Sequence, residues 1–139
     1  MKARLFGTAL IFLASLSGCQ PASPPATVPA GDSSRTSLDW AGTYAGTLPC
    51  ADCEGIRTTL TLTQAGSYTL TETYQGKDGK PFVTRGKFVW DDAGAMIRLG
   101  PEAHDAKFKV GEGRLWHLDR DGKVIVGALA DYYILTRQP

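Results

Sequence analysis

Cysteine, histidine and methionine are scarce in this 139-residue sequence, which contains three, two and two of them. It also lacks a Gly-rich phosphate loop, an HExxH motif and any Ser–His–Asp set in a supporting context, so we expect no enzyme activity. The formal net charge is only +1 and no run of like charges occurs, which argues against nucleic-acid binding. A hydrophobic content of 42% is ordinary for a globular protein and too high for a wholly disordered chain.

The sequence has no hydrophobic run long enough to span a bilayer, but it begins with a shorter apolar segment. Residues 5–16 are apolar or small, whereas a transmembrane helix needs about 20 such residues. Lys2 and Arg4 precede this segment, an order typical of a secretory signal peptide. The segment ends in Leu16-Ser17-Gly18-Cys19, which resembles the bacterial lipobox. We therefore predict a lipoprotein signal peptide over residues 1–18 and a diacylglycerol on the Cys19 thiol.

The alternative for Cys19 is an incidental cysteine in an ordinary secretory signal. The complete order of charged segment, apolar segment and Leu-Ser-Gly-Cys favours lipidation. One acyl chain attaches a protein weakly while two or more hold it firmly, so a triacylated Cys19 predicts stable attachment to a membrane. Gln20 stands where an Asp would favour the inner membrane. We therefore expect the outer membrane, with the folded part facing the periplasm or, as a variant, the cell surface.

Residues 19–37 carry mostly Pro, Ala, Ser and Thr after the cysteine and almost no large apolar side chain. Such a composition cannot bury enough surface to fold, so we expect a flexible tether. The folded part is predicted over residues 38–139, which is long enough for a single domain with its own core.

Within residues 38–139 the hydrophobic pattern has a period of two rather than 3.6. Ile56, Leu60 and Leu62 share one face of their segment, and threonines occupy much of the other. The same alternation recurs along the chain, with apolar positions at Tyr68, Leu70, Tyr74, Phe82, Phe88, Trp90, Ile97, Leu99, Phe108, Val110, Leu115, Leu118 and 132–135. This pattern is typical of antiparallel strands with one face in water.

Turn residues separate these segments at 64–67, 77–80, 91–94 and 119–122. Asp-Gly pairs in two of these turns suit the positive-φ positions of tight hairpins. We predict an all-β fold in which about eight strands form an antiparallel up-and-down meander that closes into a barrel or half-open barrel. A helix is expected only as a short insert around residues 124–130.

Cys50 and Cys53 are separated by two residues and lie between two expected strands, on a loop at one rim of the sheet. An exported chain enters an oxidising compartment, where a structural disulfide is one interpretation of the pair. A disulfide that closes so short a loop stabilises a protein by about 2 kcal/mol at most. This is enough to fix a rim loop but does not hold a whole domain together.

Two other interpretations of the pair stay open. Two thiolates suit Cu(I), which can be two-coordinate, better than zinc, whose tetrahedral site they would leave half filled. The two histidines, His104 and His117, lie in separate segments and are each expected to be surface or strand residues rather than ligands. Thiol redox catalysis is disfavoured, because Asp52 and Glu54 place negative charge beside the sulfurs and the surroundings are strand and loop.

The interior of the barrel also allows two interpretations. Its aromatic side chains can fill the core, as they can in an eight-stranded barrel, or line a cavity for a small hydrophobic ligand. We expect the filled core. Glu72 falls on an inward position of its strand, but a small twist or bulge would turn it to solvent, where we expect it. Residues 100–105 are expected to be an ordinary connection.

The segment from Trp40 to Ile56, WAGTYAGTLPCADCEGI, closely resembles the opening of the NlpE-type copper-resistance lipoproteins. The agreement continues through the YTL of residues 68–70 and the GKF of residues 86–88, and it ends in the YYIL of residues 132–135. The similarity therefore spans the predicted folded domain, and its most specific part is the run Gly-x-Leu-Pro-Cys-Ala-Asp-Cys.

The resemblance implies a lipocalin-like barrel on an outer-membrane lipoprotein. It further implies a role in envelope stress sensing and copper tolerance, with an envelope-stress sensor protein and the copper ion as partners. In the family the CxxC pair is the proposed metal or disulfide position, which carries over to Cys50 and Cys53 only. Larger members add an OB-fold domain with further cysteines, so schemes that use those cysteines are not expected of this sequence, which ends at Pro139.

The leading hypothesis is a non-enzymatic, membrane-anchored envelope protein in which Cys50 and Cys53 bind Cu(I) or report redox state, with no obligatory cofactor. One alternative is a lipocalin-like module that binds a small hydrophobic ligand. The other is a structural or partner-docking lipoprotein in which the disulfide is a staple.

Overall fold

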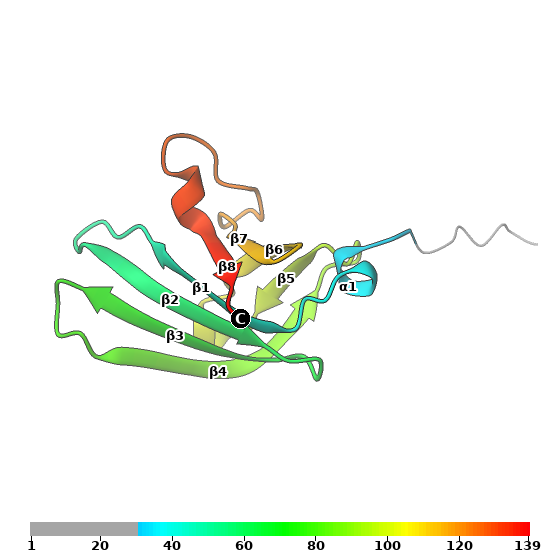
Figure 1. Cartoon of the computed structure of the whole chain (residues 1–139), viewed down its shortest axis with the longest axis horizontal. Coiled ribbons are helices and arrows are strands. Elements are labelled where there is room, and N and C mark those ends of the chain that lie inside the picture. The colour runs from blue at the N-terminus through cyan, green and yellow to red at the C-terminus, as the bar shows by residue number, and fades with distance from the viewer. Residues whose placement is uncertain (1–30) are drawn as a thin grey trace, which may run out of the picture.

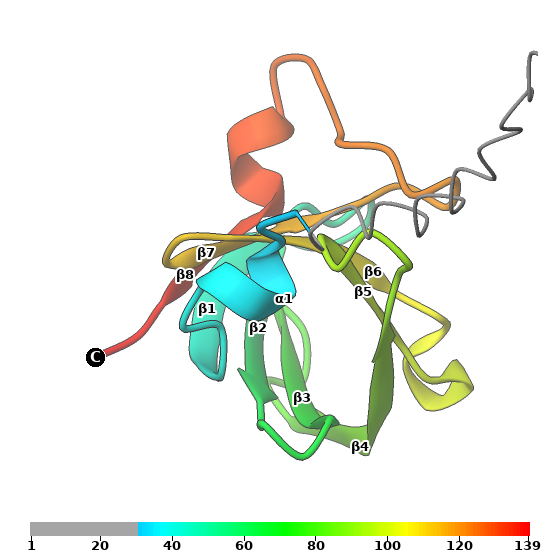
Figure 2. The same ribbon diagram turned by 90° about the vertical axis from the view of Figure 1, so that its right-hand side faces the viewer.

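The structure is a computed structural model that describes residues 31–139. These residues form one closed barrel in which strands adjacent in the sequence are neighbours in the sheet and the first strand pairs with the last (Figures 1 and 2). The strands are β1 (Gly42–Leu48), β2 (Gly55–Leu62), β3 (Ser67–Gln75), β4 (Pro81–Trp90), β5 (Met96–Leu99), β6 (Lys107–Gly111), β7 (Arg114–His117) and β8 (Ile134–Arg137). The predicted all-β meander of about eight antiparallel strands is confirmed.

The predicted signal peptide and the lipidation site Cys19 lie outside the described residues. In the part of the chain that the structure describes, no helix has the length and apolar character needed to cross a membrane.

The alternating pattern of the sequence places one face of each strand in the barrel interior. Tyr44, Leu60, Ile97, Leu115 and Leu135 come from five different strands, and each is 0% exposed. Other buried apolar side chains complete this core: Leu48, Leu62, Tyr68, Leu70, Phe88, Leu99, Phe108 and Val110. Burial of apolar surface on this scale is the main force that holds the sheet closed.

Trp40 covers one end of the barrel. Its ring lies edge-on to Phe88 and Trp90, with centroid distances of 5.8 and 5.3 Å. The Trp40 carbonyl accepts a hydrogen bond of 2.7 Å from the buried Tyr44 hydroxyl, and its indole Nε1 donates to the Arg35 carbonyl. Trp40 therefore joins the segment that precedes β1 to the aromatic core.

Residues 34–37, which the composition placed in the flexible tether, form the short helix α1 (Ser34–Ser37). The Ser34 hydroxyl donates to the Val110 carbonyl at 2.7 Å, and the Arg35 amide donates to the Gly94 carbonyl at 2.9 Å. The ordered domain therefore begins a few residues before the expected position 38. The reason is that a side-chain hydrogen bond to strand β6 and a backbone hydrogen bond to the β4–β5 turn hold a polar segment that has no apolar side chain to bury.

The up-and-down topology sends the loops alternately to two ends of the barrel. The loops β1–β2, β3–β4, β5–β6 and β7–β8 lie at one end, which we call the CxxC end because residues 49–54 belong to it. Helix α1 lies at the other end, here called the α1 end (Figure 1). The CxxC loop and the point where the chain enters the barrel are therefore at opposite ends.

The barrel interior is less completely filled at the CxxC end. Strands β2, β3 and β4 have 8, 9 and 10 residues, whereas β5 to β8 have only four or five. Only residues 88–90 of β4 pair with β5, so the first part of β4 has no partner strand on that side. The short 3-10 helix η1 (Pro101–Ala103) and the residues after it lie beside this gap.

This gap corrects the expectation of a uniformly filled core. Tyr68 and Phe88 are buried as predicted, but Phe82, on an inward position near the start of β4, is 61% exposed. Phe82 packs edge-on to Tyr74 with a centroid distance of 5.8 Å, at the end of the β3–β4 hairpin. The two rings lie where the long strands extend past the short ones, so they border the opening instead of filling the interior.

The connection between β7 and β8 is longer than a hairpin turn. Its predicted turn at 119–122 is present, and the Asp119 carboxylate accepts from the amides of Asp121 and Lys123 at 2.9 Å. The chain then pairs only at the isolated bridge Leu118–Val124 before it reaches the 3-10 helix η2 (Ala130–Tyr133). The expected insert at 124–130 is therefore mostly irregular, and the helical turn follows it.

Candidate functional site

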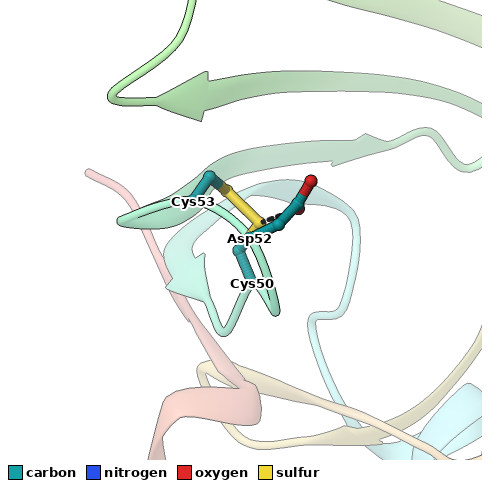
Figure 3. A group of neighbouring side chains, drawn as sticks. All are labelled: Cys50, Asp52 and Cys53. Atoms are coloured by element: carbon teal, nitrogen blue, oxygen red, sulfur yellow. Dashed lines mark hydrogen bonds between the residues drawn. A yellow bond between two sulfur atoms is a disulfide. The ribbon is translucent and has the colours of Figure 1, made fainter.

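The structure joins Cys50 and Cys53 in a disulfide on the β1–β2 loop, with a Cα–Cα distance of 5.3 Å (Figure 3). Both cysteines are partly exposed, and Ala51 and Asp52 between them are exposed. The loop follows β1 after Leu48 and enters β2 at Gly55, so two paired strands fix its ends. The pair therefore lies at the rim, where sequence analysis placed it, and is open to solvent on one side.

Asp52, between the two cysteines, ties this loop to the neighbouring hairpin. Its Oδ2 forms an ion pair of 2.8 Å with Lys77 Nζ in the β3–β4 turn, and its Oδ1 lies 3.5 Å from Cys50 Sγ. The hydrogen bond and charge of Lys77 lower the pKa of the Asp52 carboxyl. Because a disulfide sulfur has no hydrogen, only a reduced Cys50 could donate to Asp52. The carboxylate is thus placed to contact both the sulfur pair and the next turn.

The same three residues are the set of metal-binding groups that the described part of the chain brings together. The ligand atoms of Cys50, Asp52 and Cys53 all lie within 4.8 Å of one another. A metal such as Cu(I) binds thiolates, which the disulfide does not provide. The donor set therefore fits copper only when the cysteines are reduced. His104 and His117 are not members of this cluster.

Sequence analysis missed a second group of polar residues, inside the barrel. Glu72 does not turn fully to solvent as expected, and it lines a cavity of about 620 Å³ together with His104 and His117. The β3 register explains its direction, since Glu72 has the same inward parity as the buried Tyr68 and Leu70. The parity of Glu72 was visible in the sequence. What the sequence did not reveal was the gap beside β4, which leaves room for the Glu72 side chain inside the barrel.

As expected, His104 is a surface residue and His117 a strand residue, and both also border the cavity. His104 ends η1 in a left-handed conformation (φ 54°), so the loop 100–105 is a cavity wall and not merely a connection. His117 packs edge-on to Phe108 at 5.0 Å, and its Nδ1 is buried without a hydrogen-bond partner in the described residues. Desolvation lowers the pKa of His117, and the Leu118 backbone opposes this only in part.

Comparison with known proteins agrees with the fold. The family model of the NlpE N-terminal domain matches residues 44–128. Lipoprotein NlpE of Escherichia coli (strain K12) is 28% identical over 125 residues, which are 89% of this chain and 52% of that protein. The chain therefore spans about half the length of this curated relative.

Two solved structures share the barrel. A putative lipoprotein from Shewanella oneidensis, solved at 1.42 Å, has a TM-score of 0.73 and 48% identity, over 78% of this chain and 97% of its own. The Cpx pathway activator NlpE from Escherichia coli has a TM-score of 0.52 and 29% identity, over 62% of this chain and 46% of its own. Because the Shewanella chain contains little beyond the aligned domain, we expect residues 31–139 to fold by themselves.

The family model covers more than half of the sequence, and two solved relatives share the fold. The predicted resemblance is confirmed, and this chain belongs to the NlpE lipoprotein family, in which it matches the N-terminal domain.

Proposed function

We propose that this chain is a non-enzymatic lipoprotein of the outer membrane whose Cys50–Cys53 pair reports redox state or binds Cu(I) in the envelope. The observation that carries the proposal is the rim disulfide, which is solvent-accessible, lies beside the Asp52 carboxylate and is linked by Asp52 to the next hairpin. Membership of a lipoprotein family supports the envelope as its compartment.

The anchor in this proposal is a lipid on Cys19, after removal of residues 1–18. The lipobox-like Leu16-Ser17-Gly18-Cys19 and Gln20 support lipidation and outer-membrane sorting. A tether over residues 19–32 would then connect the lipid to α1, which lies at the barrel end opposite the disulfide. In this arrangement the CxxC end faces away from the membrane, where reductants and copper ions can reach it.

The chemistry of the pair is a two-electron exchange. A dithiol reductant of the envelope would deliver two electrons and two protons to the Cys50–Cys53 bond, which gives two thiols and oxidises the reductant to a disulfide. Cu(I) binding by the two thiolates would then release the two thiol protons. Asp52 lies close enough to approach the same ion, and Lys77 would lose its partner if it did.

An envelope-stress sensor is the proposed protein partner. One relative is the Cpx pathway activator NlpE of Escherichia coli, and this supports a signalling role for the barrel domain. The rim loop is the proposed input, because Asp52 lies between the two cysteines and pairs with Lys77, so a rearrangement at the disulfide would reach the β3–β4 turn.

A Cu(I) titration of reduced residues 31–139 against a competing copper chelator tests the metal half of the proposal. We expect one cysteine-dependent Cu(I) ion per domain, lost in both Cys50→Ser and Cys53→Ser. The fold is expected to survive reduction, because so short a disulfide loop contributes about 2 kcal/mol at most. Glu54→Gln keeps both sulfurs and removes an exposed carboxylate outside the donor set, so it is the matched control and is expected to retain the ion. Binding that persists in both serine variants, or none in the reduced wild type, would contradict copper binding by this pair.

A further inference from the structure

The cavity inside the CxxC end is separate from the disulfide. Its volume is about 620 Å³, and a second hollow of about 480 Å³ at the β3–β4 hairpin shares Glu72, Thr84 and His104 with it. The three shared lining residues show that the two hollows are adjacent. Pockets that bind small molecules have volumes of about 300–1,000 Å³. The space is therefore large enough for a small organic ligand.

One wall of this cavity comes from the long strands. Thr58 of β2 pairs with Glu72 of β3, and Glu72 pairs with Phe82 of β4. All three positions face inward, but Thr58 is 1% exposed and its hydroxyl donates to the Ile56 carbonyl, so its donor is already used. Glu72 is the charged residue in the middle of this row, in the part of the barrel that has no partner strand beside β4.

The Glu72 carboxylate has no hydrogen bond or ion pair among the described residues. The ion pairs within residues 31–139 are Lys77–Asp52, Arg98–Asp105 and Arg137–Asp39. Desolvation raises the pKa of the Glu72 carboxyl, and the charge of His104 opposes this only in part. An ionised carboxylate that is partly withdrawn from water without a partner costs stability. A ligand that brings a positive charge would remove this cost.

Two of the cationic side chains near the cavity are engaged elsewhere. Lys77 pairs with Asp52 on the outer rim, and Lys107 donates to the Arg120 carbonyl. Around the larger hollow Glu72, Glu102, Asp105 and Asp119 face Lys107 and Arg120, but Asp105 is paired with Arg98 and Asp119 accepts from backbone amides. Around the smaller hollow Glu72 and Asp78 face Lys77 and Lys80. The wall charges are therefore nearly balanced in number, and what favours a cationic ligand is the position of Glu72, which faces inward and has no ion-pair partner among the described residues.

The remaining wall is apolar. The larger hollow is bordered by Leu48, Leu70, Ala103, Ala106, Phe108 and Leu118. At the smaller hollow, Tyr74 and Phe82 place two perpendicular rings beside the opening. Hydrocarbon binds such a surface by the hydrophobic effect, and aromatic faces attract organic cations. The wall chemistry is therefore suited to an amphipathic molecule.

A metal ion fits this space less well. Among the described residues, the group of three potential ligands with atoms within 4.8 Å of one another is Cys50, Asp52 and Cys53, and it does not include Glu72, His104 or His117. These three polar side chains are thus too far apart to bind one ion together. An organic molecule that extends across the cavity can contact them separately.

We propose that the barrel cavity binds a small amphipathic organic cation, with its ammonium group paired to Glu72 and its hydrocarbon part against the apolar wall. This inference does not depend on the redox or copper role of the CxxC loop. It differs from a lipocalin-like site for neutral hydrophobic ligands in the charge that the ligand must carry.

Three probes with the same eight-carbon tail test the proposal: octylammonium, octanol and octanoate. Binding to residues 31–139 at neutral pH is measured by amide chemical shifts and calorimetry, below the concentrations at which the probes aggregate. We expect octylammonium to bind at least tenfold more tightly than octanol, and octanoate to bind most weakly. Glu72→Gln is expected to lower octylammonium affinity at least tenfold and to leave octanol affinity unchanged.

Glu112→Gln is the matched control, because Glu112 is exposed in the β6–β7 turn at the α1 end. It is expected to leave all three affinities unchanged. Equal binding of the three probes, or an octylammonium affinity that Glu72→Gln does not change, would overturn the proposal in favour of an unselective apolar cavity. Absence of octylammonium binding at millimolar concentration would also overturn it.

Thermal unfolding of Glu72→Gln tests whether a loss of octylammonium affinity in this variant comes from a loss of the fold. Because burial raises the pKa of Glu72, the folded protein holds this proton more tightly than the unfolded chain. The stability that this tighter proton binding contributes is fully present below the pKa of Glu72 in the unfolded chain. It is lost as the pH rises through the pKa of Glu72 in the folded protein. The variant should therefore melt above the wild type at neutral pH, and the difference should shrink in acid. A lower Tm at neutral pH would show that ionised Glu72 is satisfied within the protein and needs no ligand.

Discussion

Trp40→Ala is expected to lower the free energy of unfolding by about 3–5 kcal/mol, the usual cost of truncating a buried large aromatic residue. Trp40 is 6% exposed and packs edge-on to both Phe88 and Trp90. Alanine would leave a cavity at the α1 end of the barrel and remove the indole hydrogen bond to Arg35. Denaturant unfolding of residues 31–139, followed by circular dichroism, measures this difference.

Trp116→Ala is the control for this substitution. Trp116 is only partly buried on β7, and its ring lies within 5.4 Å of Lys109 Nζ and 5.8 Å of Arg114 Cζ on the outside of the barrel. Its loss should cost about 1 kcal/mol or less, since cation–π contacts at exposed sites contribute about that much. Equal costs for the two tryptophans would show that Trp40 does not form part of the core.

Gly46→Val is expected to destabilise the barrel by about 3 kcal/mol through the seam where β1 meets β8. A Cβ on Gly46 would lie 2.7 Å from the Ile134 carbonyl oxygen and 3.0 Å from Leu135 Cδ2. A backbone oxygen cannot move away without displacing β8, and forced overpacking of this kind costs about 1–3 kcal/mol or more. The seam is short, with the register Tyr44–Arg137 and Ala45–Thr136, so a displaced β8 would lose the few pairs that close the barrel.

The sign of the stability change in Gly46→Val distinguishes a steric clash at the β1–β8 contact from the ordinary preference of β-strands for valine over glycine. In a strand with free space, glycine is the poorer residue, and its replacement would stabilise the protein by about 0.5–1 kcal/mol. Thr47→Val, at the neighbouring exposed position of β1, is the control and should change stability by about 0.5 kcal/mol or less. The free energy of unfolding in urea measures both variants, and a stabilising Gly46→Val would contradict the close β1–β8 contact.

The fold was predictable from the sequence because its strands follow a two-residue period. Residues such as Leu60, Leu62, Ile97 and Leu99 alternate with polar neighbours, and each is buried as the period requires. Asp-Gly and similar turns fix the ends of the segments, and a meander of short hairpins leaves few other topologies. The two-residue alternation therefore predicted both which segments form strands and which side chains of each strand face the barrel interior.

The same alternation failed where strand lengths differ. Parity alone places Phe82 in the core, but at the start of β4 the sheet has no β5 partner, and the ring is 61% exposed. Glu72 lies in the same region and faces a cavity, although the residue type suggested solvent. Which strands extend beyond their neighbours depends on pairing distant in the sequence, so a local pattern cannot reveal it.

The candidate site was predicted in part. The spacing of Cys50 and Cys53 and the flanking strands correctly placed the pair on a rim loop. The contact between Asp52 and Lys77 was not predicted, because it joins two turns that are 25 residues apart. Similarly, α1 was assigned to the tether, since the hydrogen bonds that hold it involve backbone groups that composition does not describe.

Intact-mass analysis of the protein extracted from the bacterial envelope, with thiol alkylation before and after reduction, tests most directly whether this is a lipid-anchored protein with a rim disulfide. The expected mass is that of residues 19–139 with a triacylated Cys19 and two hydrogens fewer than the dithiol form. Alkylation should add no label before reduction and two labels after it, at Cys50 and Cys53. A chain without lipid, or with both rim cysteines alkylated before reduction, would contradict this assignment.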